Sequence, residues 1–309
     1  MKVLITGING FVGKYLSKYL IDKGYEVYGT IIEDNIKIDN VKICKMNLLD
    51  KGEVVETIRK IKPDQIYHLA GQSSVGLSWK NPTLTINVNV NGTINLLDSI
   101  REEKLDTKVL IIGSSDEYGP IKPENCPINE EYELNPISPY AISKVTQENI
   151  AKLYVKTYGM KIIMVRAFNH IGPMQSKNFV VSDFASRIVE IESGKERVIK
   201  VGNLEAYRDF TDVRDIVRGY NMLMEKAKIG EIYNIGSGNA IKIRDILDIL
   251  ISLSTKDIEV EIDKDKLRPS DVQIVECDNS KIKSHIGWEP ELDIRETLKD
   301  TLDYWRRNM

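Results

Sequence analysis

The chain has 309 residues, of which 42% are hydrophobic and 29% charged, and its formal net charge is −3. These values are typical of a globular protein and argue against nucleic acid as a partner, since proteins that bind nucleic acid usually carry a strong net positive charge. The spacing of the three cysteines (Cys44, Cys126 and Cys277) and of the three histidines predicts neither a disulfide framework nor a metal site. The first apolar run is too short for a signal peptide and no segment is long enough to span a membrane, so we expect a cytoplasmic protein with no membrane partner.

The first two-thirds of the chain alternates short apolar runs with longer amphipathic segments. The apolar runs predict strands at Val3–Thr6, Glu26–Ile32, Lys42–Cys44, Gln65–Leu69, Val109–Ile112 and Ile162–Val165. Apolar residues at helical spacing predict helices at Phe11–Asp22, Val54–Ile61, Thr83–Arg101 and Ser138–Tyr158. This alternation predicts an α/β fold with a doubly wound parallel sheet of the Rossmann type.

The pattern becomes less regular after about Asn169. The expected elements there are helices at Phe184–Glu192, Ile243–Leu253 and Ile294–Trp305 and strands at Val198–Val201 and Glu231–Ile235. We therefore expect residues 1–168 to form a dinucleotide-binding domain, to which segments around 205–240 return. Residues 169–309 are expected to form mainly a smaller, discontinuous α/β lobe that binds the substrate.

A glycine-rich turn follows the first expected strand. Gly7, Gly10 and Gly13 have GxxGxxG spacing, and Phe11 and Val12 open the next helix. Glycines at a strand–helix junction let the backbone approach a pyrophosphate, whose charge the helix amides then meet. The arrangement predicts a nicotinamide dinucleotide, NAD(P)H, bound over this turn.

Residues after the next strands are expected to contact the rest of the dinucleotide. Glu33 follows the second strand, and no arginine lies beside it, which favours a ribose 2′-hydroxyl and hence NAD. A solvated Glu33 is the alternative, so NADP stays open. The expected contacts after the third and fourth strands are Asn47, Leu48, Leu69, Ala70 and Gly71.

A tyrosine and a lysine four residues apart begin the helix near Ser138. Tyr140 and Lys144 share one helix face, so Lys144 can reach the cofactor ribose beside the Tyr140 hydroxyl. The ammonium and an oxidised nicotinamide are expected to lower the pKa of Tyr140 and make it an acid–base group. Ser114 or Ser115, after the fifth strand, would hydrogen-bond the reacting carbonyl. The alternative is that the pair is an ordinary surface contact within a helix.

With these residues in place, the chain resembles the extended short-chain dehydrogenase/reductase family over essentially its full length. The motifs that carry the resemblance are GxxGxxG at Gly7, HLAGQ at His68, NVNGT at Asn89, GSSDEYG at Gly113, SPYAISK at Ser138, RAFNHIGP at Arg166 and RDFTDVRD at Arg208. Within the family, the chain is most similar to GDP-mannose 4,6-dehydratases and GDP-6-deoxy-D-mannose reductases. The resemblance implies a GDP-linked sugar as substrate and a homodimer formed through the helices Thr83–Arg101 and Ser138–Tyr158.

The resemblance also implies the site residues. Ser114, Tyr140 and Lys144 would be catalytic. The residues expected to line the nucleotide-sugar pocket are Ser73, Ser114, Ser115, Asn169, Phe179, Val180, Arg187, Val201, Arg208, Arg268 and Asp271. Arg208 and Arg268 could pair with the GDP phosphates, and intramolecular ion pairs are the alternative for each arginine.

Asp116 favours one reaction over another within this resemblance. Dehydratases carry a glutamate at this position, and a shift of a catalytic group by about 1 Å costs on the order of 100-fold in rate. Epimerase–reductases carry a cysteine there and a histidine where this chain has Met174, so that reaction loses both its acid and its base. We therefore expect a reductase that delivers hydride to C4 of GDP-4-keto-6-deoxy-D-mannose.

The alternatives are a 4,6-dehydratase and, outside enzymes, a dinucleotide-sensing regulator; the retained Tyr140 and Lys144 argue against the regulator. His170 is either a substrate contact or a packed neutral histidine.

Overall fold

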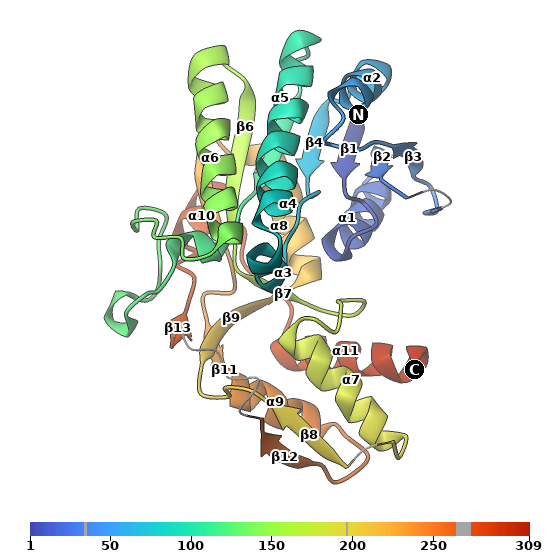
Figure 1. Ribbon diagram of the computed structural model, residues 1–309, viewed down its shortest axis with the longest axis vertical. Helices are drawn as coiled ribbons and strands as arrows, with labels where there is room; N and C mark the ends of the chain where they lie inside the picture. Colours follow the sequence, from blue (N-terminus) through green and yellow to red (C-terminus); the bar gives the residue numbers. More distant parts are fainter. Residues whose placement is uncertain (34–35, 196, 264–272) are drawn as a thin grey trace.

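In the computed structural model, which describes residues 1–33, 36–195, 197–263 and 273–309, the chain forms two lobes of unequal size. The larger lobe holds the N-terminus and a sheet between two layers of helices, and the smaller lobe holds the C-terminus (Figure 1). Among the described residues, no helix has the length and apolar character needed to cross a membrane.

The larger lobe is built on a seven-stranded parallel sheet. Its strand order is β10-β6-β5-β4-β1-β2-β3, in which the direction of winding reverses between β1 and β4. The strands are β1 (Lys2–Thr6), β2 (Glu26–Ile31), β3 (Lys42–Lys45), β4 (Gln65–His68), β5 (Lys108–Ile112), β6 (Lys161–Ala167) and β10 (Ile232–Ile235). All residues of β4 and nearly all of β1 are buried, as expected of central strands covered on both faces. This order makes the carboxyl ends of β1 and β4 the point where such sheets bind ligands.

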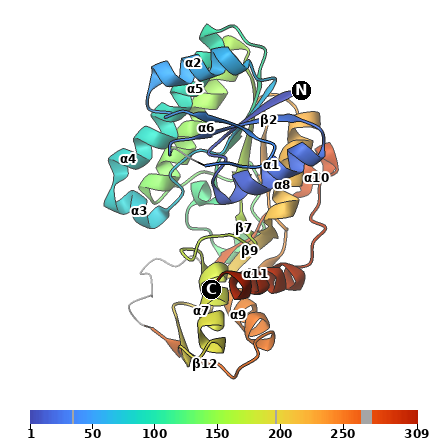
Figure 2. The same cartoon turned by 90° about the vertical axis from the view of Figure 1, so that its right-hand side faces the viewer.

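Helices cover both faces of this sheet, as the view in Figure 2 shows. One layer contains α1 (Phe11–Asp22), α8 (Val213–Lys226) and α10 (Ser280–Ile286). The other contains α2 (Lys51–Ile61), α5 (Gly92–Glu102) and α6 (Pro139–Tyr158), with the short helices α3 (Val75–Lys80) and α4 (Pro82–Ile86) beside α6. The packed side chains, which include Leu16, Tyr67, Tyr220 and Trp288 on the α1–α8 side, form the main core.

In the part of the chain that the structure describes, the smaller lobe consists of short strands and three helices. A mixed sheet joins β7 (Asn169–Ile171), β9 (Tyr207–Asp212), β11 (Ala240–Lys242) and β13 (Ile274–Val275), and β8 (Val198–Val201) pairs with β12 (Glu259–Ile262). Helices α7 (Val180–Glu192), α9 (Ile243–Ser252) and α11 (Ile294–Asn308) pack on one another. Their apolar faces form a second core that includes Phe184, Ile188, Leu247 and Leu298.

The doubly wound parallel sheet predicted from the sequence is confirmed, but the helices differ from the prediction in several places, and the short helices α3 and α10 were not predicted. The expected helix Thr83–Arg101 is α4 and α5 joined by a π-helical turn at Asn87–Asn91. Helix α8 was not predicted. It lies against α1, and with β10 it returns the chain from the smaller lobe to the main sheet.

Candidate active site

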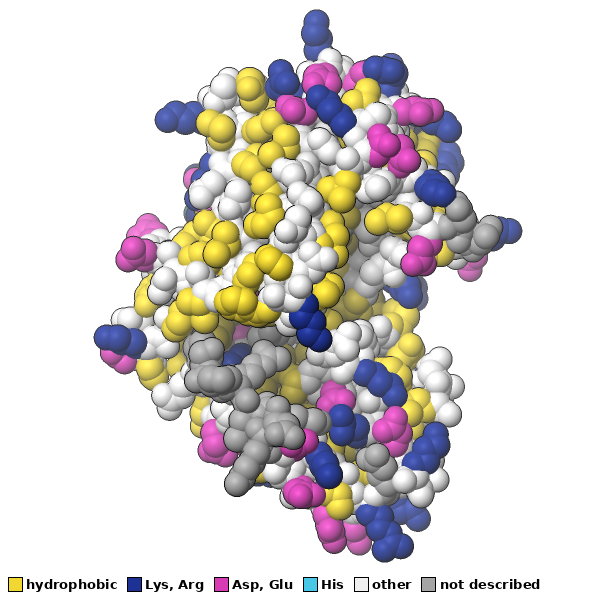
Figure 3. All heavy atoms as spheres, in the orientation of Figure 1, with side chains coloured by type: hydrophobic (Ala, Val, Ile, Leu, Met, Phe, Trp, Pro, Cys, Tyr) yellow, Lys and Arg dark blue, Asp and Glu magenta, His cyan; other side chains and the backbone are white. Residues whose placement is uncertain are grey.

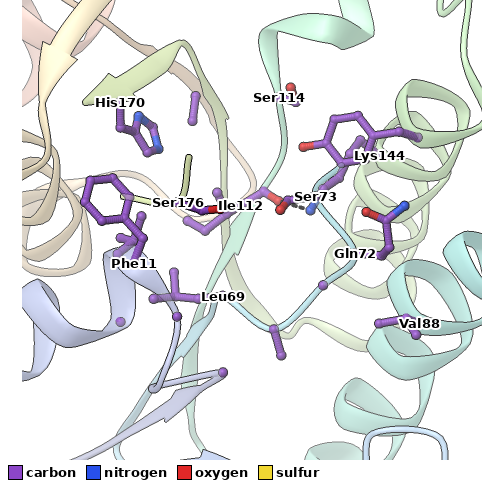
Figure 4. Close-up of a pocket in the computed structure, with 18 of the residues that line it drawn as sticks. Phe11, Leu69, Gln72, Ser73, Val88, Ile112, Ser114, Lys144, His170 and Ser176 are labelled. Atoms are coloured by element: carbon purple, nitrogen blue, oxygen red, sulfur yellow. Dashed lines mark hydrogen bonds between the residues drawn. The ribbon is translucent and has the colours of Figure 1, made fainter. Parts of the chain in front are cut away.

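A cavity of about 880 Å³ lies at the carboxyl ends of the central strands. Its wall is formed by the loops after β1, β2, β3, β4 and β5 and by residues 167–181, which lead into the smaller lobe. Figure 4 shows Phe11 and His170 on one side of this cavity and Ser114 and Lys144 on the other. The cavity is therefore bounded by both lobes.

The glycine turn allows a close approach of backbone to ligand. Gly7 has φ +69°, and a Cβ there would lie 2.9 Å from the Ala70 Cα atom; a Cβ on Gly13 would lie 2.6 Å from the Ile8 carbonyl oxygen. These positions therefore exclude side chains. The N-cap of α1 is Gly10, which supplies no capping side chain, so the first amides of the helix face the cavity without a side-chain acceptor. Such a helix end binds anions.

Every residue expected to bind the dinucleotide lines the cavity. Besides the glycine turn, these residues are Phe11, Val12, Glu33, Asn47, Leu48, Leu69, Ala70, Gly71, Tyr140 and Lys144. Lys144 is the only lysine or arginine among the described residues of the lining.

The expected catalytic residues meet at the end of β5 and the start of α6. Ser138 caps α6 by accepting a hydrogen bond from the Ala141 amide, and this fixes Tyr140 in the first turn. Tyr140 is hydrogen-bonded to Ser114 and 7% exposed. Lys144, one turn later, donates to the Ile112 carbonyl at 2.7 Å (Figure 4). The arrangement places a phenol, a hydroxyl and an ammonium in one wall of the cavity.

The protein groups alone raise the pKa of Tyr140, contrary to the expected lowering. Burial is the main cause, and the Asp116 carboxylate adds to it, whereas the hydrogen bond to Ser114 acts in the opposite direction. Burial also lowers the pKa of Lys144 to about 8, partly offset by Glu117. The phenol is therefore held in its acid form and the lysine titrates near neutrality.

Asp116 and Glu117 are neighbours in different environments. Asp116 is exposed in the cavity wall, and its carboxylate accepts a hydrogen bond from the Ser114 hydroxyl at 3.3 Å. Glu117 is fully buried and accepts the Ser114 amide at 2.7 Å in a capping box. Burial and the nearby Glu148 raise the pKa of Glu117. Asp116 thus faces the cavity, while Glu117 supports the serine from behind.

The residues expected to bind substrate fall into three groups. Ser73, Ser115, Asn169, Phe179 and Val180 line the cavity together with Ser114. Three others lie outside its lining: Arg187 pairs with Asp183 at 2.8 Å, Val201 is buried in the core of the smaller lobe, and Arg208 donates to the Tyr207 carbonyl. Arg268 and Asp271 lie outside the described residues. Substrate roles for all of these residues stay predictions.

Several lining residues were not predicted. His170 was left open between two interpretations; its ring lies in the cavity wall, and burial lowers its pKa to about 4, so it is neutral. Tyr220, from the unpredicted helix α8, lies 3.4 Å from the His170 Nε2 atom. Gln175 also lines the cavity, and its amide donates to the His170 carbonyl. No periodicity signals these residues, because loop and helix geometry brings them together.

Behind Lys144 lies a buried polar network that the sequence did not reveal. The π-helical turn directs Asn89 to the loop after β4, where it accepts the Gln72 amide at 2.7 Å and donates to Ser143 at 2.8 Å. No group of three or more potential metal ligands occurs among the described residues. The site therefore offers acid–base and anion-binding groups, which suit chemistry at a carbonyl beside a bound dinucleotide.

Known proteins are similar to this chain in sequence and in fold over most of their length. Residues 4–301 match the family model of GDP-mannose 4,6 dehydratase. The chain is 30% identical over 98% of its length to a GDP-6-deoxy-D-mannose reductase of Pseudomonas aeruginosa, covering 97% of that protein. It is 32% identical over 97% of its length to GDP-mannose 4,6 dehydratase 2 of Arabidopsis thaliana, covering 85% of that protein.

Two solved structures are similar throughout. The structure of RMD from Pseudomonas aeruginosa complexed with NADPH has a TM-score of 0.89 and 29% identity, covering 100% of this chain and 99% of that one. The Thermus thermophilus UDP-glucose 4-epimerase complex with NAD has a TM-score of 0.89 and 28% identity, with 100% of both chains covered. With the glycine turn and the Ser–Tyr–Lys wall, these matches show that the chain belongs to the GDP-mannose 4,6 dehydratase family of the extended short-chain dehydrogenase/reductases.

Proposed function

We propose that this enzyme is a reductase that transfers a hydride from NAD(P)H to C4 of GDP-4-keto-6-deoxy-D-mannose and forms GDP-D-rhamnose, a precursor of polysaccharides. The observation that carries the proposal is the buried Tyr140 phenol, hydrogen-bonded to Ser114 and kept in its acid form. A carbonyl that accepts a hydride needs a proton at its oxygen, and a phenol with a raised pKa holds that proton.

The chain's own groups divide the work in this reaction. The cofactor supplies the hydride from its reduced nicotinamide. Ser114 hydrogen-bonds the C4 carbonyl oxygen, and Tyr140 donates the proton to that oxygen. Lys144 holds the ribose and contributes positive charge beside the phenol, which favours proton release as the alkoxide forms.

Asp116 supports reduction over dehydration. Its carboxylate is hydrogen-bonded to Ser114, and it disfavours ionisation of Tyr140. Dehydration would begin with Tyr140 as a base, and it would also need an acid–base group that reaches C5 and C6 of the sugar. The aspartate is one methylene shorter than the glutamate of the dehydratases, so it is a poorer candidate for the second task.

A GDP-mannose 4,6-dehydratase is the second candidate. The family model carries that description, and Asp116 is a carboxylate exposed in the cavity wall. In this reaction the cofactor would be reduced and reoxidised within one turnover, with no net consumption.

We further propose that NADH is preferred over NADPH. Glu33 lines the cavity after β2, and the described lining has no arginine or lysine near it. A carboxylate can accept a hydrogen bond from a ribose 2′-hydroxyl and repels a 2′-phosphate. The ratio of kcat/KM for the two cofactors measures this preference, and Glu33→Arg is expected to reverse it.

An absorbance assay separates the two reactions. The protein is incubated with GDP-mannose or with GDP-4-keto-6-deoxy-D-mannose, in each case with NADH or NADPH, and the reduced nicotinamide is followed. Steady consumption with the keto sugar supports the reductase. Conversion of GDP-mannose without net change in the cofactor would instead establish the dehydratase.

The assembly we propose is a homodimer formed by α4, α5 and α6. Leu84 on α4 and Ile142, Leu153 and Tyr158 on α6 are exposed hydrophobic residues. Hydrophobic side chains gather over this face of the larger lobe (Figure 3). Exposed apolar patches of this kind mark protein interfaces.

A further inference from the structure

The ammonium of Lys144 is held by two acceptors inside the protein. Its Nζ atom donates to the Ile112 carbonyl at 2.7 Å and to the Gln147 side-chain oxygen at 3.0 Å. An ammonium has three N–H donors, so two are used by these groups. The wall at Gly71 is close as well, because a Cβ there would lie 3.8 Å from Nζ. The third N–H of Lys144 is left on the side of the ammonium that faces the cavity.

Gln147 is itself held in one orientation. It is 1% exposed, and its amide nitrogen donates to the Thr93 hydroxyl oxygen at 2.6 Å. Because Lys144 can only donate, the amide oxygen must face Lys144 and the nitrogen must face Thr93. A flipped amide would place donor against donor at Lys144.

The Thr93 hydroxyl extends the chain to β4. It donates to the Asn89 carbonyl at 2.7 Å, so it must accept from both Gln147 and His68, whose Nε2 atom lies 3.0 Å away. His68 therefore carries its proton on Nε2, and Nδ1 accepts from the Thr6 hydroxyl at 2.9 Å. Burial lowers the pKa of His68 to about 3, which keeps this tautomer neutral.

We propose that Gln147 is a positioning residue that fixes the Lys144 ammonium and aims its third N–H at the cofactor. The hydrogen-bonded chain Thr6–His68–Thr93–Gln147–Lys144 then connects the strand before the glycine turn to the lysine. The inference rests on the proposed function, because it assigns the ribose-holding task to Lys144.

A neutral amide suits this position. Several ionisable groups lie near Lys144: Tyr140 on its own helix, with Asp116 close to that phenol, Glu117 from the turn after β5, and neutral His68 from β4. An amide accepts a hydrogen bond from the ammonium without cancelling its charge. A glutamate at 147 would form an ion pair and compete with the ligand, whereas an apolar residue would leave Lys144 and Thr93 each with one partner fewer.

Three variants test the proposal in the full-length protein. Gln147→Met removes both hydrogen bonds at similar size, and Gln147→Glu keeps the shape and adds charge. Thr301→Val is the control, because Thr301 in α11 is equally buried, its hydroxyl donates to the Thr297 carbonyl, and it is not among the residues that line the cavity. The readouts are the Kd for NADH by fluorescence titration, the pH profile of kcat/KM for NADH, and Tm.

We expect Gln147→Met to weaken NADH binding about tenfold and to move the alkaline limb of the profile down by about one pH unit. Gln147→Glu is expected to move the limb up by a similar amount, because the carboxylate stabilises the ammonium. Thr301→Val should match the wild type in both readouts. If Gln147→Met does not fold, the upward shift of the alkaline limb in Gln147→Glu tests the proposal, and an unshifted limb in that variant would overturn it.

Suppose that the wild type binds NADH and reduces the keto sugar, but that both Gln147 variants keep the wild-type Kd for NADH and the wild-type alkaline limb of the kcat/KM profile. This result would overturn the positioning role of Gln147 and leave the proposed function intact. A wild type that binds no nicotinamide cofactor would overturn both.

Discussion

Tyr140 and Lys144 respond to burial in opposite directions. Burial raises the pKa of the phenol and lowers the pKa of the lysine to about 8, because it disfavours the charged form of each. At neutral pH the wall therefore presents a proton on Tyr140 and a positive charge on Lys144, which is the protonation state that a reduction needs.

Removing the phenol hydroxyl tests the role of Tyr140. Tyr140→Phe should lower kcat for reduction by about 10²- to 10⁴-fold, because the general acid is lost. The Kd for NADH, measured by fluorescence, should stay close to that of the wild type. A variant that keeps wild-type kcat would show that another group donates the proton.

The pH profile reports the state of Lys144. Its ammonium predominates below a pH of about 8 and is lost above it. We therefore expect kcat/KM for NADH to be constant below this pH and to fall as the pH rises through it, while Tyr140 remains protonated over the same range. Steady-state rates between pH 6 and 10 (roughly two pH units on either side of the lysine pKa) test this, and a profile that rises across pH 8 would contradict it.

The turn between β1 and α1 is the element on which cofactor binding depends. Gly7, Gly10 and Gly13 keep the backbone bare where it approaches Ala70 and the amides of α1. The same close packing leaves no room for side chains in the turn, so both cofactor binding and local packing require glycine at these positions.

Gly13→Ala is expected to displace this turn. Its Cβ would lie 2.6 Å from the Ile8 carbonyl and 2.8 Å from that of Gly7, and both are backbone atoms. We expect the affinity for NADH to fall roughly 10- to 100-fold, since a displaced turn loses a hydrogen bond to the charged pyrophosphate and such a bond contributes about 1.5–3 kcal/mol. In the matched control Gly76→Ala, the Cβ meets nothing closer than 3.9 Å, and affinity should be unchanged. Equal affinities in the two variants would count against the assigned phosphate turn.

The sequence predicted the parallel sheet and its glycine turn because each depends on local patterns. Strand β1 is a buried apolar run, and α1 has helical spacing. The pattern could not show the π-helical turn that directs Asn89, because apolar spacing continues on both sides of it. It also missed Gln147 and Tyr220, which reach the site only through the packing of α6 and α8 against the sheet.

At the scale of the whole molecule, the cavity has walls from both lobes. Residues of the larger lobe line the end of the cavity where we expect the dinucleotide. Asn169, Phe179 and Val180 line the cavity where the chain enters the smaller lobe. Segments far apart in the sequence thus meet at one cavity, which is why site residues are harder to predict than strands.

The dimer can be tested through one helix face. Ile142 and Leu153 lie eleven residues apart on α6, on the same side, and are 47% and 56% exposed. Leu153→Glu is expected to convert the dimer to a monomer, because a charge would be buried at the interface. Light scattering after gel filtration measures the mass. Ile229→Glu, at a 40% exposed residue before β10, should leave it unchanged. A monomeric wild type would contradict the proposed interface.

Transfer of a label from the cofactor to the sugar tests the central claim most directly. NADH that carries deuterium at both C4 positions of the nicotinamide is incubated with the enzyme and GDP-4-keto-6-deoxy-D-mannose, and the product is examined by NMR. The account predicts one deuterium at C4 of the sugar for each NADH oxidised. A product without deuterium at C4, or no oxidation of NADH in the presence of the keto sugar, would contradict it.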